Sequence, residues 1–198
     1  KFPNTITLYE FFQRAYGNPE SKRFKKAQQN FLESMAGYSV VCYLLQIKDR
    51  HNGNILIDRE ANIVHIDFGF FLGNSPGGVG FESAPFKLTS EFIEVMGGPD
   101  GEMFNNYFRP LVFMCFKAAA KHKEKILSLI RMMSGTNFPC FMGDPSAAQA
   151  IKQLEQRFQA QLDDMKFAQW VRDLVDESID NWRTRQYDSF QRLTNGIM

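Results

Sequence analysis

The sequence predicts a mainly helical chain with one small β-hairpin, an α+β fold. Apolar residues recur every three or four positions over residues 21–46 and through most of residues 89–198, the period of helices that bury one face. Between these regions, residues 55–57 and 63–66 form short β-branched segments separated by polar turn residues, a pattern typical of paired strands. With 198 residues, the chain is long enough for one domain with its own core.

Two helices are expected before the hairpin. A short helix with apolar residues at Leu8, Phe11 and Phe12 should end at Gly17. The second is a single long helix over residues 21–46. Its last part, residues 40–45, is apolar on every side, so we expect it to be buried and to support the segment that follows.

After the hairpin, a glycine-rich stretch with little regular structure leads into a series of helices. Thr89 should cap the first of them, and Gly97 and Gly98 should end it. Pro110 should kink or divide the apolar segment at residues 104–122. Further helical patterns follow at residues 123–133, 146–158 and 165–179, and an aromatic stretch covers residues 181–198.

The charge and cysteine content exclude several classes of protein. With 23 basic and 22 acidic residues the net charge is only +1, so no global field attracts nucleic acid, and no nucleic-acid partner is expected. The three cysteines lie far apart and form no C-x-x-C pattern, which indicates free thiols in a reducing compartment. The apolar runs are too short to span a bilayer, so a cytoplasmic protein is expected.

A set of polar residues around the hairpin has the spacing of a phosphoryl-transfer site. Such a site needs an Asp to accept the substrate hydroxyl proton, an Asn five residues later and a following Asp-Phe-Gly. Asp49, Asn54 and residues 67–69 meet these requirements in order. Asn54 and Asp67 flank the hairpin, where their oxygens suit Mg²⁺ shared with substrate phosphates. However, residues 49–51 run Asp-Arg-His, the reverse of the protein-kinase order.

This inverted motif resembles the phosphatidylinositol 3- and 4-kinase superfamily. Asp-Arg-His-Asn-Gly-Asn at residues 49–54 and His-Ile-Asp-Phe-Gly-Phe at residues 65–70 carry the resemblance, which extends over nearly the whole chain. Within the superfamily, Phe70 and residues 46–48, 86–89 and 95–98 look like a type III phosphatidylinositol 4-kinase. The alpha-like branch is favoured by residues 8–17, residues 75–78, and Tyr187-Asp188 followed by Asn195-Gly196-Ile197.

The resemblance implies the C-lobe of a protein-kinase-like catalytic domain. The catalytic loop would span residues 48–54, the activation loop residues 67–88 and the C-terminal helices residues 101–198. No glycine-rich phosphate loop or strand with a nucleotide lysine precedes Asp49, so we expect the N-lobe and an upstream helical region to lie elsewhere in a longer protein.

The implied reaction is phosphorylation of phosphatidylinositol at its 4-hydroxyl, with ATP and with Mg²⁺ or Mn²⁺ as the metal. Asp49 would orient the hydroxyl and take its proton, and His51 is the competing base because an imidazole titrates near ~6.5. Asn54 and Asp67 would hold the metal. By resemblance the protein would work peripherally at the plasma membrane with scaffold proteins.

Further residues are assigned to ATP and to the lipid. By similarity, Leu56 and Ile66 would form the floor beneath the adenine, while Lys48 would reach a phosphate or face solvent. Lys87 lies in an activation loop with few cations, which suits a head group with one phosphate. Its neighbour Phe86 either anchors the loop or contacts the lipid.

The final stretch allows two interpretations. Trp182, Arg183 and Arg185 begin an aromatic segment with cations beside its apolar side, which could lie in a membrane interface or close the base of the lobe. For the whole chain, two other functions remain open. One is a protein kinase of the related superfamily, and the other is a non-catalytic membrane or scaffold module.

Overall fold

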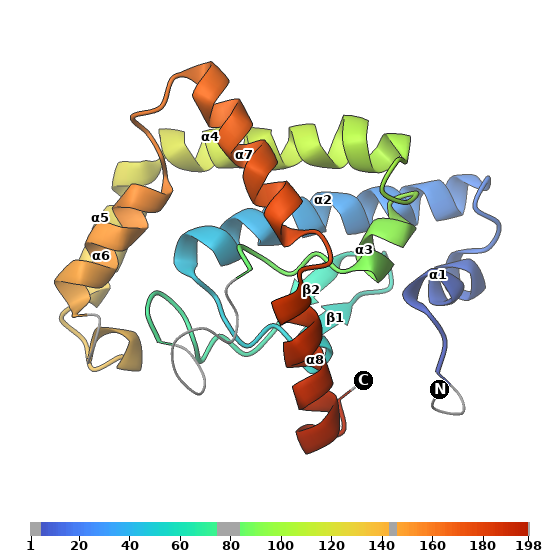
Figure 1. Cartoon of the computed structure of the whole chain (residues 1–198), viewed down its shortest axis with the longest axis horizontal. Coiled ribbons are helices and arrows are strands. Elements are labelled where there is room, and N and C mark those ends of the chain that lie inside the picture. The colour runs from blue at the N-terminus through green and yellow to red at the C-terminus, as the bar shows by residue number, and fades with distance from the viewer. Residues whose placement is uncertain (1–4, 75–83, 143–145, 198) are drawn as a thin grey trace.

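The protein is described by a computed structural model that covers residues 5–74, 84–142 and 146–197 (Figure 1). Within these residues the chain is mainly helical and has one antiparallel sheet of two strands, as predicted. The strands are β1 (Ile55–Ile57) and β2 (Ile63–His65). The helices are α1 (Leu8–Tyr16), α2 (Lys22–Leu45), α3 (Ser90–Val95), α4 (Arg109–Lys121), α5 (Lys123–Met133), α6 (Ala147–Arg157), α7 (Asp164–Ser178) and α8 (Trp182–Asn195).

The long helix α2 is the centre of the fold and confirms the prediction of one uninterrupted helix. It crosses the middle of the molecule, with α4 packed along it and β2 and α6 in contact with it (Figure 1). Ser21 caps its first turn by accepting a hydrogen bond from the backbone of Phe24. The helix ends at Gln46, which adopts the left-handed conformation at φ 51° and turns the chain into the predicted catalytic loop.

The hairpin lies across α2 with one face buried. Leu56 pairs with Val64 in the register, so the side chains of Leu56, Val64 and Ile66 share the outer face while Ile63 and His65 face inward. The ring of His65 stacks on Tyr38 of α2 at 4.2 Å between ring centroids. This packing fixes the hairpin, and therefore both of its polar ends, relative to the helix that precedes the catalytic loop.

The predicted helix boundaries at Thr89 and Pro110 follow local backbone chemistry. Thr89 caps α3 by accepting a hydrogen bond from the backbone of Phe92, and Gly97 follows the helix at φ +95°, where glycine avoids a steric penalty. The apolar segment is divided at Pro110, as predicted, because a π-helical segment, Met103–Phe108, leads into α4 with this proline in its first turn.

Two pairs of helices pack outside α2. Helix α7 packs against α4, and α5 packs against α6 (Figure 1). Trp170 of α7 connects the α4–α7 pair to α2, with its ring 5.7 Å from Tyr43, 5.0 Å from Phe116 and 5.2 Å from Phe167. In the predicted helix at residues 165–179, Phe167 is buried in the core, whereas Met165 is 85% exposed.

The cysteines and the segment around Cys140 can also be compared with the sequence. Cys42, Cys115 and Cys140 are free thiols, as predicted. Cys140 and Phe141 are buried, whereas Phe138 is exposed. Among the described residues, no helix combines the length and hydropathy required to cross a bilayer.

Helix α8 is joined to the end of the predicted activation loop. The backbone N–H of Asp180, just before α8, donates to the carbonyl of Leu88 at 2.9 Å, and Leu88 and Ile179 form an isolated parallel bridge. The helix then extends past the hairpin toward the catalytic loop (Figure 1).

Candidate active site

Two short backbone segments hold the site in place. The N–H of Leu72 donates to the carbonyl of Leu45 at 2.7 Å, and the N–H of Lys48 donates to the carbonyl of Phe70 at 2.9 Å. These bonds run the segment after Asp67-Phe68-Gly69 alongside the start of the catalytic loop. The catalytic-loop motif at residues 49–54 and the Asp-Phe-Gly motif at residues 67–69 therefore lie side by side.

Arg50 connects the two motifs by hydrogen bonds to both segments. It is buried, and its guanidinium donates to the carbonyls of Lys48 and Ile66, both at 2.9 Å, and to the carbonyl of Asp67. One planar group with several donors can satisfy three carbonyls from two loops, which a lysine cannot do with the same geometry. Arg50 therefore braces the catalytic loop against the segment at Asp67.

Asp49 and Asp67 both have left-handed backbones, at φ 65° and φ 58°. This conformation is uncommon for residues other than glycine, although Asp tolerates it better than most, and such outliers cluster at functional sites. The surrounding hydrogen bonds hold the carboxylates at these turns, one on each loop.

Asp49, Asn54 and Asp67 come together at the open end of the hairpin. The side-chain amide nitrogen of Asn54 donates to the carbonyl of Asp49 at 2.9 Å and lies 3.4 Å from its Oδ2. The N–H of Ile66 donates to the carbonyl of Asn54 at 3.1 Å, which places Asp67 next to Asn54. Asp67 is exposed, and its Oδ1 accepts the N–H of Gly69 at 3.2 Å.

This donor set fits a hard divalent cation shared with phosphates. The amide nitrogen of Asn54 is directed to Asp49, which leaves its oxygen on the other branch of the amide, and Asp67 supplies an exposed carboxylate. Within the described ranges no cluster of three or more His, Cys, Asp or Glu forms a metal centre. The assignment of Mg²⁺ to Asn54 and Asp67 stays a prediction, with which their oxygen donors are compatible.

His51 has a defined orientation. Its Nδ1 accepts the N–H of Gly53 at 3.1 Å, and its Nε2 lies 3.6 Å from Oδ1 of Asp49. The 3.6 Å separation is longer than a hydrogen bond, and whether Asp49 or His51 accepts the substrate proton stays a prediction.

The outer face of the hairpin is an exposed apolar surface next to Asn54 and Asp67. Leu56 is 48% exposed and Ile66 39% exposed, although both are large aliphatic side chains. On the opposite face, His65 is buried, and burial together with the charges of Arg50 and Lys87 lowers its pKa to about 4. His65 is therefore neutral and structural, with its Nδ1 3.6 Å from the Cys42 thiol.

Lys87 and Phe86, predicted to contact substrate, are buried. The Lys87 ammonium contacts Oδ1 of Asn52 at 2.9 Å and the two carboxylate oxygens of Asp188 at 2.6 and 2.8 Å. An ammonium has three donors, and this set occupies all of them. Phe86 belongs to the core cluster. The geometry favours anchoring for both residues, and head-group contact stays a prediction that would require the Lys87–Asp188 pair to open.

Helix α8 has an inner and an outer face. Trp182 is 52% exposed with the guanidinium of Arg183 4.9 Å from its ring, and Arg185 pairs with Asp180 at 2.6 Å. On the inner face, the hydroxyl of Tyr187 donates to Oδ1 of Asp49. The sequence analysis did not predict this contact. It used Tyr187 and Asp188 only as markers of the alpha-like branch.

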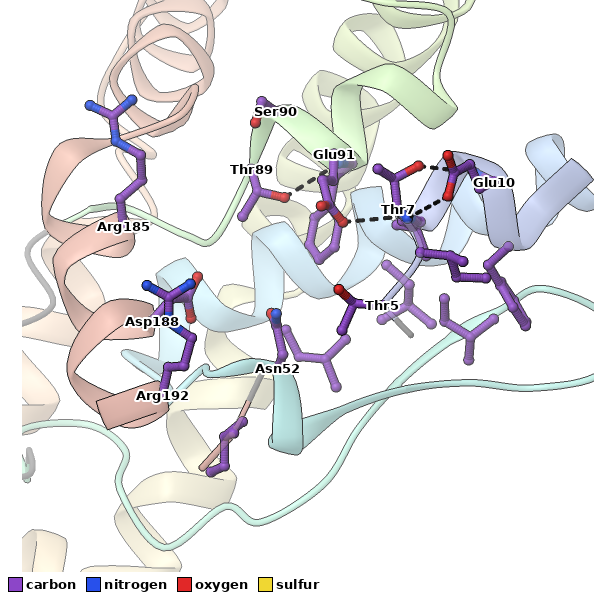
Figure 2. A pocket seen from close by; sticks show the side chains of 18 of the residues that line it. Thr5, Thr7, Glu10, Asn52, Thr89, Ser90, Glu91, Arg185, Asp188 and Arg192 are labelled. Atoms are coloured by element: carbon purple, nitrogen blue, oxygen red, sulfur yellow. Dashed lines mark hydrogen bonds between the residues drawn. The ribbon is translucent and has the colours of Figure 1, made fainter. Parts of the chain in front are cut away.

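A cavity of about 800 Å³ lies beside the catalytic loop, between α1, α3, α8 and the inner side of the hairpin. Figure 2 shows Asn52 at one wall, with Asp188 and Arg192 of α8 facing it and Thr89 and Glu91 across the opening. Asp49, Asn54 and Asp67 do not line this cavity. It is therefore a separate space from the outer hairpin face predicted to take ATP.

Comparison with known proteins supports the chemistry of this site. The sequence profile described as "Phosphatidylinositol 3- and 4-kinase" matches residues 1–143. The chain is 51% identical to phosphatidylinositol 4-kinase beta 1 of Arabidopsis thaliana, 50% to phosphatidylinositol 4-kinase of Dictyostelium discoideum, and 47% to phosphatidylinositol 4-kinase beta of Danio rerio. These matches cover 98–100% of the chain but only 16–23% of the relatives.

The relatives correct the predicted branch. Those named by type are beta, so the alpha-like assignment is wrong, and the plasma-membrane location that depended on it has no support. Tyr187 and Asp188, two of the residues used for the branch, contact Asp49 and Lys87. Residues 75–78, also used for the branch, lie outside the described residues.

Proposed function

Because the chain belongs to the phosphatidylinositol 3- and 4-kinase family, we propose that the protein transfers the γ-phosphoryl group of ATP to the 4-hydroxyl of phosphatidylinositol. The chain would supply the catalytic lobe, with the N-lobe and an upstream helical region in the rest of a longer protein. The observation that carries the proposal is the convergence of Asp49, Asn54 and Asp67 at one end of the hairpin, braced by Arg50.

Phosphoryl transfer depends mainly on positioning and on neutralising charge, so few residues need defined roles. Asp49 would orient the attacking hydroxyl and accept its proton. Asn54 and Asp67 would hold Mg²⁺ or Mn²⁺, which when bound neutralises charge on the phosphates. The exposed side chains of Leu56 and Ile66 would lie under the adenine, and Lys48 would contact a phosphate.

The lipid substrate requires contact with a membrane surface. The outer side of α8 exposes Trp182, Phe190 and Leu193, the last at 84% exposure, and the guanidinium of Arg183 lies over the Trp182 ring. Apolar side chains flanked by cations suit the interface of an anionic bilayer. We therefore include α8 as a peripheral membrane contact. The expectation of scaffold partners depended on the alpha-like branch and is not extended to this protein.

The test is an assay of the full-length protein with ATP, Mg²⁺ and phosphatidylinositol vesicles, with a peptide acceptor in parallel. Labelled product should co-migrate with phosphatidylinositol 4-phosphate and disappear in Asp49→Ala and Asp67→Ala. Asp173→Asn, an exposed carboxylate of α7, is the control and should keep full activity. Label in the peptide without label in the lipid would overturn the proposal in favour of a protein kinase.

A further inference from the structure

Helix α8 reaches the centre of the proposed active site through Tyr187. This side chain is buried, and its hydroxyl donates a hydrogen bond to Oδ1 of Asp49, a residue 138 positions away in sequence. The same oxygen faces Nε2 of His51 at 3.6 Å, whereas Asn54 lies near the other oxygen, Oδ2, at 3.4 Å. The carboxylate is therefore contacted by donors from α8 and from its own loop.

Tyr187 is the first member of a hydrogen-bond relay along α8. The amide nitrogen of Gln191 donates to the Tyr187 hydroxyl at 2.9 Å, and the amide nitrogen of Asn195 donates to the Gln191 oxygen at 2.5 Å. The three residues are spaced four apart, so they lie on one face of the helix. Every donor points toward Asp49, and hydrogen bonds in such a chain strengthen one another.

A second anchor holds α8 against the same loop. Asp188, next to Tyr187, pairs with Lys87, and Lys87 in turn contacts Asn52 of the catalytic loop. Figure 2 shows Asp188 on α8 facing Asn52. Farther along, a side chain at Gly53 would lie 3.4 Å from Cδ1 of Ile197. The C-terminal segment thus meets the loop at Asp49, at Asn52 through Lys87, and at Gly53. These contacts leave Tyr187 little freedom to move.

From this arrangement we propose that Tyr187 is a positioning residue for the phosphoryl transfer, and that the relay through Gln191 and Asn195 sustains it. The Tyr187 hydrogen bond fixes the rotation of the Asp49 carboxylate by holding Oδ1, which directs Oδ2 toward the substrate hydroxyl. The inference rests on the proposed function, since it assigns a role within that reaction. The opposite possibility is that Tyr187 blocks Asp49, and it predicts the opposite change in rate.

The main test is Tyr187→Phe in the full-length protein, assayed with phosphatidylinositol vesicles. A misplaced catalytic group costs up to about a hundredfold in rate, so kcat should fall roughly 10- to 100-fold while KM for ATP changes less than about twofold. Tyr16→Phe is the matched control. Tyr16 is a second buried tyrosine, and its hydroxyl donates to the carbonyl of Asp58 at 3.3 Å, away from the site. This variant should leave kcat unchanged.

A second variant keeps the tyrosine and perturbs only the relay. Gln191→Glu replaces the amide that donates to Tyr187 with a carboxylate that competes with Asp49 for the hydroxyl proton, so kcat should fall again. Gln186→Glu adds the same charge at an exposed position of α8 and should have no effect. If Tyr187→Phe proves unstable by thermal denaturation, the Gln191 and Gln186 pair decides the question.

The outcomes separate the two proposals. Absence of lipid phosphorylation by the unaltered protein would refute the proposed function. An active protein in which Tyr187→Phe or Gln191→Glu matches its control, or is faster than the unaltered protein, would refute the positioning role alone. A fall in kcat confined to Tyr187→Phe and Gln191→Glu supports it.

Discussion

The pair formed by Lys87 and Asp188 should make a measurable and asymmetric contribution to the docking of α8. The Lys87 side chain is 3% exposed, whereas that of Asp188 is 26% exposed, and their closest atoms are 2.6 Å apart. Asp188→Ala removes the carboxylate from a buried ammonium, for which the neutral amide oxygen of Asn52 is a weaker acceptor. Breaking a buried pair in this way costs about 3–5 kcal/mol.

Lys87→Met should cost less, about 1–3 kcal/mol, because Asp188 can still be reached by water. The double variant should recover much of the loss of Asp188→Ala, since no buried charge is then left without its partner. This asymmetry follows from the two exposures and not from the mere presence of an ion pair.

Amide hydrogen exchange over residues 182–195 of the full-length protein can measure this cost. The buried residues of α8 are Tyr187 and Gln191, so we expect the helix to open as a unit. A cost of 3–5 kcal/mol raises exchange between about a hundredfold and a few thousandfold, since about 1.4 kcal/mol is a factor of ten. Equal effects of Asp188→Ala and Lys87→Met, or a double variant no better than Asp188→Ala, would contradict the reasoning.

Three further predictions concern other parts of the lobe. Burial and the nearby cations hold the pKa of His65 at about 4, below the ordinary 6.5, so its stabilising effect is complete above pH 6.5 and is lost as pH falls toward 4. The loss should be about 2 kcal/mol at pH 5, and melting temperatures of His65→Gln should depend less on pH than those of the unaltered protein. Leu56→Asp should raise KM for ATP at least tenfold, whereas Leu129→Asp, at an exposed leucine of α5, should not; equal values would remove Leu56 from the nucleotide site. Leu193→Asp should weaken sedimentation with anionic vesicles severalfold, with Met165→Asp on α7 as the control; if both variants sediment alike, α8 is not the membrane contact.

Local features of the fold were predictable because each is determined by nearby residues. The apolar stripe of α2, the β-branched segments of the hairpin and the cap at Thr89 act over a few positions, and the structure confirms all three. The motif spacing also predicted the convergence of Asn54 and Asp67, because a hairpin necessarily brings its ends together.

Contacts between distant segments were not predictable in this way. Lys87 appears in sequence as a lone cation suited to a head group, and only the approach of Asp188 from α8 shows that it is buried in a pair. Tyr187, Gln191 and Asn195 appear in sequence as ordinary polar and aromatic residues of an amphipathic helix. Their common role depends on the position of α8 over the catalytic loop, which no local pattern encodes.

The two faces of α8 separate two tasks that sequence analysis treated as alternatives. At about 100° per residue, Trp182, Phe190 and Leu193 fall within an arc of roughly 80°, while Gln191 and Asn195 lie roughly opposite that arc and Tyr187 lies about 60° beyond its edge. A helix can therefore close the lobe with one face and expose an apolar surface with the other. The faces should respond separately, because a change at Leu193 alters membrane binding without touching the relay, and Tyr187→Phe alters kcat without changing the exposed surface.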